Sequence, residues 1–186
     1  MRDEDNALDS GTMKAIAKLP IFLDLAGRKA VLAGETAGIA WKAELIAAAG
    51  AHVTLYAPRP SEEARALASR GVAAGSLRIV EREWTPEDIK GAAIAVGDFH
   101  TYGEALCFKT AGLTAGVIVN TVDKGKTCDF YFGTVVSRSP LMIGATSDGT
   151  APILAQAVRR AIELAVPAWL GPWLDLARAI RPEVKR

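Results

Sequence analysis

An aspartate that follows an apolar run is the first candidate for chemistry in this chain. Asp123 comes shortly after Val117–Val119, whose β-branched residues are typical of a buried strand. In open α/β sheets, ligands bind beyond the carboxyl ends of the strands. A carboxylate in that place can act as a general base if its surroundings tune its pKa. The alternative is a solvated loop aspartate that caps a turn, and position alone favours that alternative.

A loop with two glycines provides the second candidate. It joins a predicted strand, Arg28–Ala33, to an alanine-rich predicted helix, Ala40–Ala49. Amide groups at a helix N-terminus can cradle a pyrophosphate, and glycines let the backbone approach it. Gly34 and Gly38 suit this role, whereas Thr36 stands where the usual dinucleotide motif has a glycine. The pattern favours dinucleotide binding, with a simple tight turn as the alternative.

The residues after the second predicted strand leave the choice of cofactor open. His52–Ala57 is followed by Pro58 and Arg59, where an acid normally binds the adenosine ribose. An arginine could bind a 2′-phosphate, or it could be a surface residue. NAD and NADP therefore cannot be distinguished from this position.

Two further polar sites follow predicted elements. Ser147 precedes a predicted helix, Pro152–Leu164, and we expect it to be the N-cap. An exposed helix N-terminus also favours anions such as a substrate carboxylate. His100 follows Gly97 and Asp98 at the carboxyl end of another strand, where it could line a pocket. No cluster of cysteine and histidine in the sequence has zinc spacing.

Composition excludes several classes of protein. The 186 residues are 50% hydrophobic and 23% charged, which is ordinary for a globular protein. A net charge of +1 provides no strong field for nucleic acid or a membrane surface. The two cysteines have no pairing or metal spacing and suit a reducing compartment. The acidic N-terminus is unlike a signal peptide, and no apolar stretch could span a bilayer. We expect a cytoplasmic protein.

Strands that alternate with helices predict an α/β fold, a Rossmann-like doubly wound parallel sheet. Two short strands, Tyr131–Val136 and Leu141–Ala145, then predict an antiparallel pair around the turn Ser137–Pro140. We expect the apolar segment Leu19–Leu23 to pack on the domain. The predicted divisions are a flexible arm at 1–18, a dinucleotide-binding domain at 19–129, a β-rich connector at 130–147 and a helical segment at 148–186.

The helical segment is predicted to end in a second helix, Trp169–Ile180. Trp169 and Trp173 lie four residues apart on it, so we expect them to form core or a packing face.

Several pieces of the chain together resemble one family, the N-terminal module of siroheme synthase. This module is a precorrin-2 dehydrogenase and a sirohydrochlorin ferrochelatase. The pieces stand in the order and near the spacing of that family, from residue 19 to about residue 165. The most specific is Ser137–Met142 running into Thr146–Pro152. The others are Leu19–Phe22, Ala33–Lys42, Ala49–Ala51 and Val119–Asp123.

The resemblance implies roles for particular residues. Asp123 falls on the family's catalytic aspartate, the candidate base for both dehydrogenation and metal insertion, and Ser147 falls on a serine beside the tetrapyrrole pocket. The implied cofactor is NAD. The implied assembly is a homodimer in which the connector and helices are exchanged. The expected cofactor-binding residues are Gly34, Thr36, Ala37, Gly38, Pro58, Arg59, Gly97 and Asp98, and the expected substrate-pocket residues are Asn120, Arg138 and Ser147.

Three positive side chains could neutralise the carboxylates of a tetrapyrrole substrate. Lys124, Lys126 and Arg138 lie close in sequence to Asp123 or Ser147. They could equally be solvated loop charges, and the sequence leaves this open.

The leading hypothesis is an NAD-dependent precorrin-2 dehydrogenase that forms sirohydrochlorin, with or without insertion of ferrous iron. One rival is a non-catalytic module that binds a dinucleotide or a tetrapyrrole. Another is a different small Rossmann oxidoreductase. Relative to the family, the helical segment that ends at Arg186 is shorter than usual.

Overall fold

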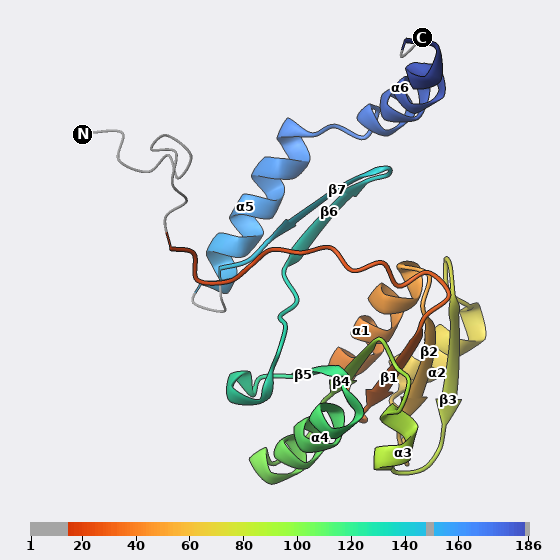
Figure 1. Cartoon of the computed structure of the whole chain (residues 1–186), viewed down its shortest axis with the longest axis vertical. Helices are drawn as coiled ribbons and strands as arrows, with labels where there is room; N and C mark the ends of the chain where they lie inside the picture. Colours follow the sequence, from red (N-terminus) through yellow and green to blue (C-terminus); the bar gives the residue numbers. More distant parts are fainter. Residues whose placement is uncertain (1–14, 148–150, 185–186) are drawn as a thin grey trace.

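The computed structural model describes residues 15–147 and 151–184. Its centre is a parallel five-stranded sheet with the order β3-β2-β1-β4-β5 (Figure 1). The order reverses between β1 and β4, so a crevice opens beyond the carboxyl ends of these two strands. The predicted Rossmann-like α/β fold is confirmed. The strands are β1 (Lys29–Ala33), β2 (His52–Tyr56), β3 (Ser76–Val80), β4 (Ile94–Gly97) and β5 (Ile118–Thr121).

Helices cover both faces of this sheet because its strands are apolar on both sides. In β1, Leu32 packs in the core beneath α1 and α2, whereas Val31 packs in the core beneath α3 and α4. Both side chains are fully buried. The helices are α1 (Ala37–Ala48), α2 (Glu62–Arg70), α3 (Pro86–Ile89) and α4 (Tyr102–Ala115).

Local capping sets where these helices begin. The Ser61 hydroxyl accepts a hydrogen bond from the Ala64 amide at 3.2 Å and caps α2. The start of α1 at Ala37 is three residues earlier than predicted. The reason is Thr36, whose hydroxyl accepts from the Ile39 amide at 3.2 Å and caps the helix there.

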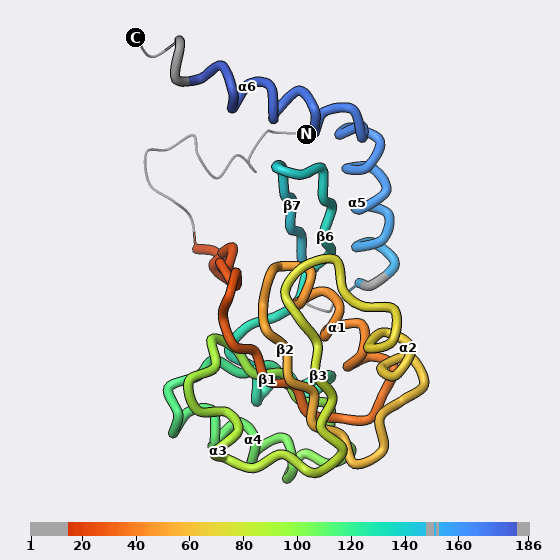
Figure 2. Tube along the Cα trace, turned by 90° about the vertical axis from the view of Figure 1, so that its right-hand side faces the viewer, coloured from red at the N-terminus to blue at the C-terminus, as the bar shows by residue number. Residues whose placement is uncertain are grey.

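An extension follows the sheet. Strands β6 (Thr134–Arg138) and β7 (Leu141–Ala145) form the predicted antiparallel hairpin. Its turn is shorter than predicted, because Arg138 pairs with Leu141 as the last rung of the ladder. Helices α5 (Pro152–Ala165) and α6 (Leu170–Val184) complete the extension. Figures 1 and 2 show that the hairpin, α5 and α6 project away from the five-stranded sheet.

The expectation that Leu19–Leu23 packs on the domain is wrong for the single chain. For Trp169 and Trp173 the core is excluded, and a packing face stays a prediction. Leu19 and Phe22 are 75% and 73% exposed, and Trp169 and Trp173 are 62% and 65% exposed. The segment that holds Phe22 runs past the extension instead of over the sheet (Figures 1 and 2). A hairpin covered by helix on one side leaves apolar surface that one chain does not bury.

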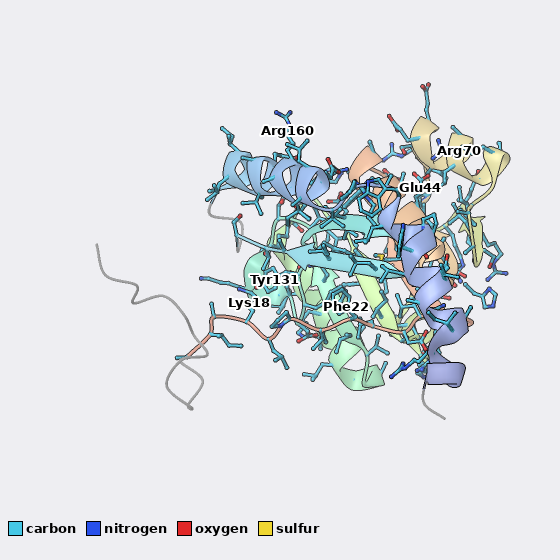
Figure 3. All side chains as sticks on the ribbon, turned by 90° about the horizontal axis from the view of Figure 1, so that it is seen from above. Lys18, Phe22, Glu44, Arg70, Tyr131 and Arg160 are labelled. Atoms are coloured by element: carbon cyan, nitrogen blue, oxygen red, sulfur yellow. The ribbon has the colours of Figure 1, made fainter. Side chains whose placement is uncertain are left out.

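Lys18, in the described part of the N-terminal arm, contacts an aromatic ring. The Lys18 ammonium lies 4.3 Å from the ring centroid of Tyr131, and Figure 3 shows these two side chains together. The rest of the predicted arm, residues 1–14, lies outside the described residues. Within residues 15–147 and 151–184, no helix is long and apolar enough to cross a membrane.

Candidate functional site

The loop between β1 and α1 lies at the point where the strand order reverses. Gly34 has φ +143°, and a Cβ there would lie 2.7 Å from the carbonyl oxygen of Asp98, so only glycine fits. The Thr36 hydroxyl donates a hydrogen bond to the Asp98 carboxylate. The loop is thus fixed against the end of β4. Helix α1 has no acidic residue in its first turn, so its N-terminus suits an anionic group.

A cavity of about 390 Å³ lies beside this loop. Four strand ends build it: the residues after β1, those after β2, those after β3 and those after β4. His100 is among them, as its position after β4 allowed. Of the eight expected cofactor-binding residues, the cavity is lined by Gly34, Thr36, Pro58, Arg59 and Asp98.

The other three expected cofactor-binding residues do not line the cavity. Ala37 and Gly38 are exposed in the first turn of α1. Gly97 is buried, and a Cβ there would lie 2.2 Å from the Phe99 ring, so this glycine makes room for an aromatic side chain.

Glu35 gives the cavity an acidic group to which sequence reasoning assigned no role. Its carboxylate accepts a hydrogen bond from the Arg59 amide at 2.8 Å and lies 3.4 Å from the Arg59 guanidinium. The Glu35 side chain is 28% exposed and the Arg59 side chain 87% exposed. A sequence signal did exist, since an acid stands within the glycine loop while the end of β2 has none.

Tyr56, from β2, lines the same cavity and is held by an ion pair. The Arg82 guanidinium lies 4.6 Å from the Tyr56 ring centroid and donates to Asp88 at 2.7 and 2.8 Å. Asp88 also accepts from the Thr85 amide at 2.7 Å, as part of the capping box at the start of α3. Arg82 holds the pKa of Asp88 well below its usual value. Burial, and then Asp88, raise the pKa of Tyr56.

Asp123 lies in a turn directly beside the end of β4. The Val122 amide donates to the Gly97 carbonyl at 2.8 Å, and the Lys124 ammonium donates to the Phe99 carbonyl at 2.6 Å. Asp123 stands between these two anchors with φ +56°, a left-handed conformation that aspartate tolerates better than most residues. Its side chain is exposed and is not part of the cavity lining.

The segment after this turn is fastened back onto β5. The Asn120 amide donates to the Phe130 carbonyl at 2.9 Å, and the Asp129 amide donates to the Val119 carbonyl at 2.7 Å. Asn120 is buried, so its side chain serves this backbone contact in the isolated chain. The fastening fixes the position of Asp123 from both sides.

Lys42 connects the loop helix with Asp123. It lies half-buried on α1, with its ammonium 4.4 Å from the ring centroid of Phe132. Burial lowers the pKa of Lys42, while the charges of Asp123 and Asp98 act in the opposite direction. The ammonium therefore lies within electrostatic reach of both carboxylates.

Two expected substrate residues lie on the extension. The Arg138 guanidinium donates to the carbonyls of Val166 and Glu163 at 2.8 and 3.4 Å, and so satisfies the C-terminal end of α5. Ser147 is not the N-cap of α5, because Ala151, four residues later, holds that position and the helix starts at Pro152. Its hydroxyl donates to the Ala151 carbonyl at 3.4 Å instead.

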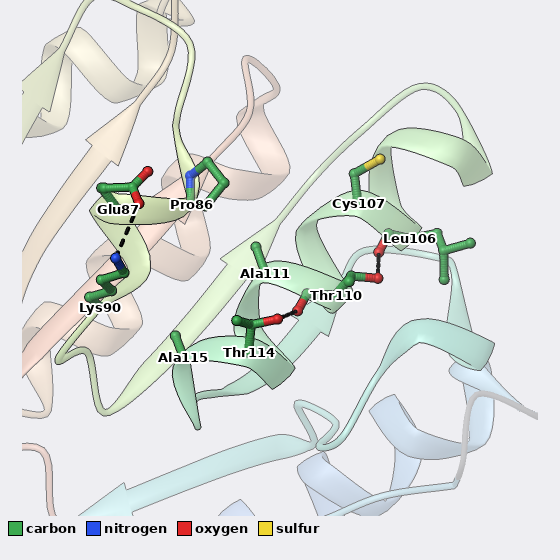
Figure 4. A pocket seen from close by; sticks show the side chains of 9 residues that line it. All are labelled: Pro86, Glu87, Lys90, Leu106, Cys107, Thr110, Ala111, Thr114 and Ala115. Atoms are coloured by element: carbon green, nitrogen blue, oxygen red, sulfur yellow. Dashed lines mark hydrogen bonds and ion pairs between the residues drawn. The ribbon is translucent and has the colours of Figure 1, made fainter.

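A second cavity, of about 530 Å³, lies between α3 and α4 (Figure 4). Leu106, Ala111 and Ala115 give it a mainly apolar wall, and none of the expected site residues lines it. Among the described residues, no group of three or more histidine, cysteine, aspartate or glutamate side chains could hold a metal ion.

A protein-family model indicates which class of ligand this site binds. Residues 21–134 match the family model described as "Putative NAD(P)-binding". This chain belongs to that family. The match covers the loop, the cavity and Asp123, so a nicotinamide dinucleotide is the cofactor class of the fold.

Individual relatives of the chain include siroheme synthases. The chain is 33% identical to the "Siroheme synthase" of Stutzerimonas stutzeri over 167 residues, which is 90% of this chain and 35% of that protein. It is 34% identical to "Siroheme synthase 2" of Aeromonas salmonicida over 169 residues, 90% of this chain and 34% of that protein. The resemblance to siroheme synthases is confirmed. The chain spans about a third of the length of these relatives.

The fold is also found in a solved structure. "SirC, precorrin-2 dehydrogenase" superposes with a TM-score of 0.66 and 17% identity, over 91% of this chain and 81% of that chain. Since the superposition covers more than the dinucleotide-binding region, the shared architecture includes the hairpin and helical extension.

Proposed function

We propose that this protein is an NAD-dependent dehydrogenase that oxidises precorrin-2 to sirohydrochlorin in siroheme biosynthesis. The family match, the siroheme synthase relatives and the shared fold all support this activity. The observation that carries the proposal is the position of Asp123. It stands beside the end of β4, and the Gly34–Thr36 loop is fixed to that same strand end.

The chain's own residues fit the dinucleotide. The N-terminus of α1 would face the pyrophosphate, and the end of β2 would hold the adenosine ribose. The nicotinamide would then lie toward β4 and β5, on the side of Asp123. When bound, NAD supplies the hydride acceptor.

Asp123 would be the base. Dehydrogenation removes a hydride and a proton from the substrate, and an exposed carboxylate in a fixed turn can take the proton. Lys42 would contribute a positive charge between the loop helix and this carboxylate.

The precorrin-2 carboxylates need further cations. Lys124 and Arg138 are held by backbone carbonyls in the isolated chain, which leaves the exposed Lys126 as the candidate nearest to Asp123 in sequence.

Insertion of ferrous iron is the second activity that we propose for this site. Iron is a substrate here, and it displaces two pyrrole protons from sirohydrochlorin. A base is needed again, so Asp123 would serve both steps.

We also propose a homodimer, in which the apolar surface of the extension is covered by a second copy.

A direct assay tests the proposed function. Purified protein is mixed with precorrin-2 and NAD without oxygen, and the absorbance of sirohydrochlorin is followed. We expect sirohydrochlorin to accumulate in proportion to the reduced cofactor, and added ferrous iron to convert it to siroheme. Binding of both ligands without turnover would refute the dehydrogenase and favour the alternative below.

The alternative function is a non-catalytic module that binds a dinucleotide or a tetrapyrrole. One observation favours it. The Thr36 hydroxyl directs the Asp98 carboxylate toward the loop that should hold a pyrophosphate, and two negative groups repel each other.

A further inference from the structure

In most dinucleotide-binding folds, the residue that distinguishes NAD from NADP follows β2. An acid in that place accepts hydrogen bonds from the adenosine ribose, whereas an arginine accommodates a 2′-phosphate. Here β2 is followed by Pro58 and Arg59, a pattern that by itself would suit NADP.

The structure brings a different acid to this place. Glu35 comes from the loop after β1, yet its carboxylate binds the Arg59 backbone amide at 2.8 Å. The neighbouring oxygen of the same carboxylate lies 3.4 Å from the Arg59 guanidinium. Glu35, Pro58 and Arg59 line one cavity together with the start of the phosphate loop. The acid that the sequence lacks after β2 is therefore supplied by the loop after β1.

We infer that Glu35 binds the adenosine ribose hydroxyls and makes this site selective for NAD over NADP. This inference rests on the proposed dinucleotide binding. Each carboxylate oxygen has more than one acceptor position, so Glu35 can hold Arg59 and still accept from a ribose hydroxyl. A 2′-phosphate in the same place would face a carboxylate.

The charges around the cavity also favour NAD over NADP. Arg59 is the only lysine or arginine among the lining residues, and Glu35 already accompanies it. The lining carboxylates outnumber it: Glu35, Glu83, Asp98 and Glu104. His100 is the one other basic residue in the lining. An additional phosphate dianion would therefore meet net negative charge at this edge.

Binding titrations test the inference without any turnover. The dissociation constants of NAD and NADP are measured by calorimetry for the wild type and for Glu35→Gln. The glutamine keeps the size of the side chain and can still accept from the Arg59 amide, but it lacks the charge. We expect the wild type to bind NAD more tightly. In Glu35→Gln, the preference for NAD should fall roughly 10- to 100-fold, the worth of a hydrogen bond to a charged group.

Two further variants test whether the released Arg59 guanidinium causes the gain in NADP binding. In the double variant Glu35→Gln with Arg59→Ala, the gain in NADP binding should disappear, because the released guanidinium is what would bind the 2′-phosphate. The matched control is Glu44→Gln, which breaks another exposed Glu–Arg pair on α1, with Arg70 at 2.6 Å (Figure 3). It lies outside the cavity lining and should leave the cofactor preference unchanged.

The outcomes that overturn the inference are distinct. If the wild type binds NAD but Glu35→Gln keeps the same preference, or Glu44→Gln shifts it equally, the assignment of Glu35 is wrong. A wild type that prefers NADP also refutes it. If the wild type binds neither dinucleotide, the proposed function falls together with this inference.

Discussion

At the scale of single residues, the backbone of Asp123 limits which substitutions are informative. With φ +56°, the residue occupies a left-handed conformation in which a side chain with Cβ is usually strained. Asparagine and aspartate tolerate this conformation better than alanine. Asp123→Asn therefore removes the negative charge and the basicity while it preserves both the size of the side chain and the turn.

We predict that Asp123→Asn lowers dehydrogenase turnover by roughly two to four orders of magnitude, the usual worth of a positioned general base. NAD affinity and thermal stability should stay near the wild-type values, because the side chain is exposed and lines no part of the cofactor cavity. Iron insertion should fall as well, since it also removes protons. Steady-state rates with a parallel NAD titration measure this. Near-wild-type turnover would mean that Asp123 is only a turn residue.

At the scale of elements, the short helix α3 depends on the charge of Asp88. This carboxylate accepts from Arg82 and from the Thr85 amide, and these bonds hold its pKa below the usual value. Because the pKa is lower in the folded state than in the unfolded state, the stabilisation is complete above the unfolded pKa, near 3.9. It is lost as the pH falls through the lower folded pKa.

Asp88→Asn should therefore lower the free energy of unfolding at neutral pH by about 1 kcal/mol, typical for the loss of a helix cap. It should also remove part of the decline in stability below about pH 4. Urea unfolding at neutral and acid pH measures both effects. The control is Glu87→Gln on the same helix, whose exposed partner is Lys90 and which should matter much less. Equal losses in the two variants would contradict the assigned role of Asp88.

How far the sequence predicts these elements depends on whether their causes are local. The caps at Ser61 and Thr85 were predictable because the cap and its amide partner lie three residues apart. The buried strands were predictable from apolar runs. The contact of Glu35 with Arg59 was not, because it joins residues 24 positions apart that only the β1–β2 pairing brings together.

The same distinction applies to the candidate site. Asp123 could be proposed from its position after a strand and from family resemblance. Its left-handed backbone, and the nearby charge of Lys42, arise from tertiary contacts that no local pattern encodes. Likewise, Arg138 looked like a substrate cation in the sequence, but in the folded chain it binds carbonyls 25 and 28 residues away.

At the scale of the whole molecule, the extension exposes more apolar surface than a lone chain normally tolerates. The exposed side chains come from the segment before β1, from β7, from both C-terminal helices and from the turn between those helices. They include Leu19, Phe22, Met142, Ile153, Leu154, Leu164, Trp169, Trp173 and Leu176. A second copy that offers the same surface could cover them about a two-fold axis, as in most soluble homodimers.

We therefore predict that the chain is a dimer at micromolar concentration, measured by light scattering, and that Trp173→Glu converts it to a monomer. A tryptophan that becomes buried when two chains associate often contributes strongly to the interface. A glutamate in its place would have to lose its water shell in the dimer. The control is Leu113→Glu, which alters an equally prominent residue, 73% exposed, on α4 of the sheet domain. It should leave the mass unchanged. A monomeric wild type, or a dimer that both variants disrupt alike, would place the interface elsewhere or exclude it.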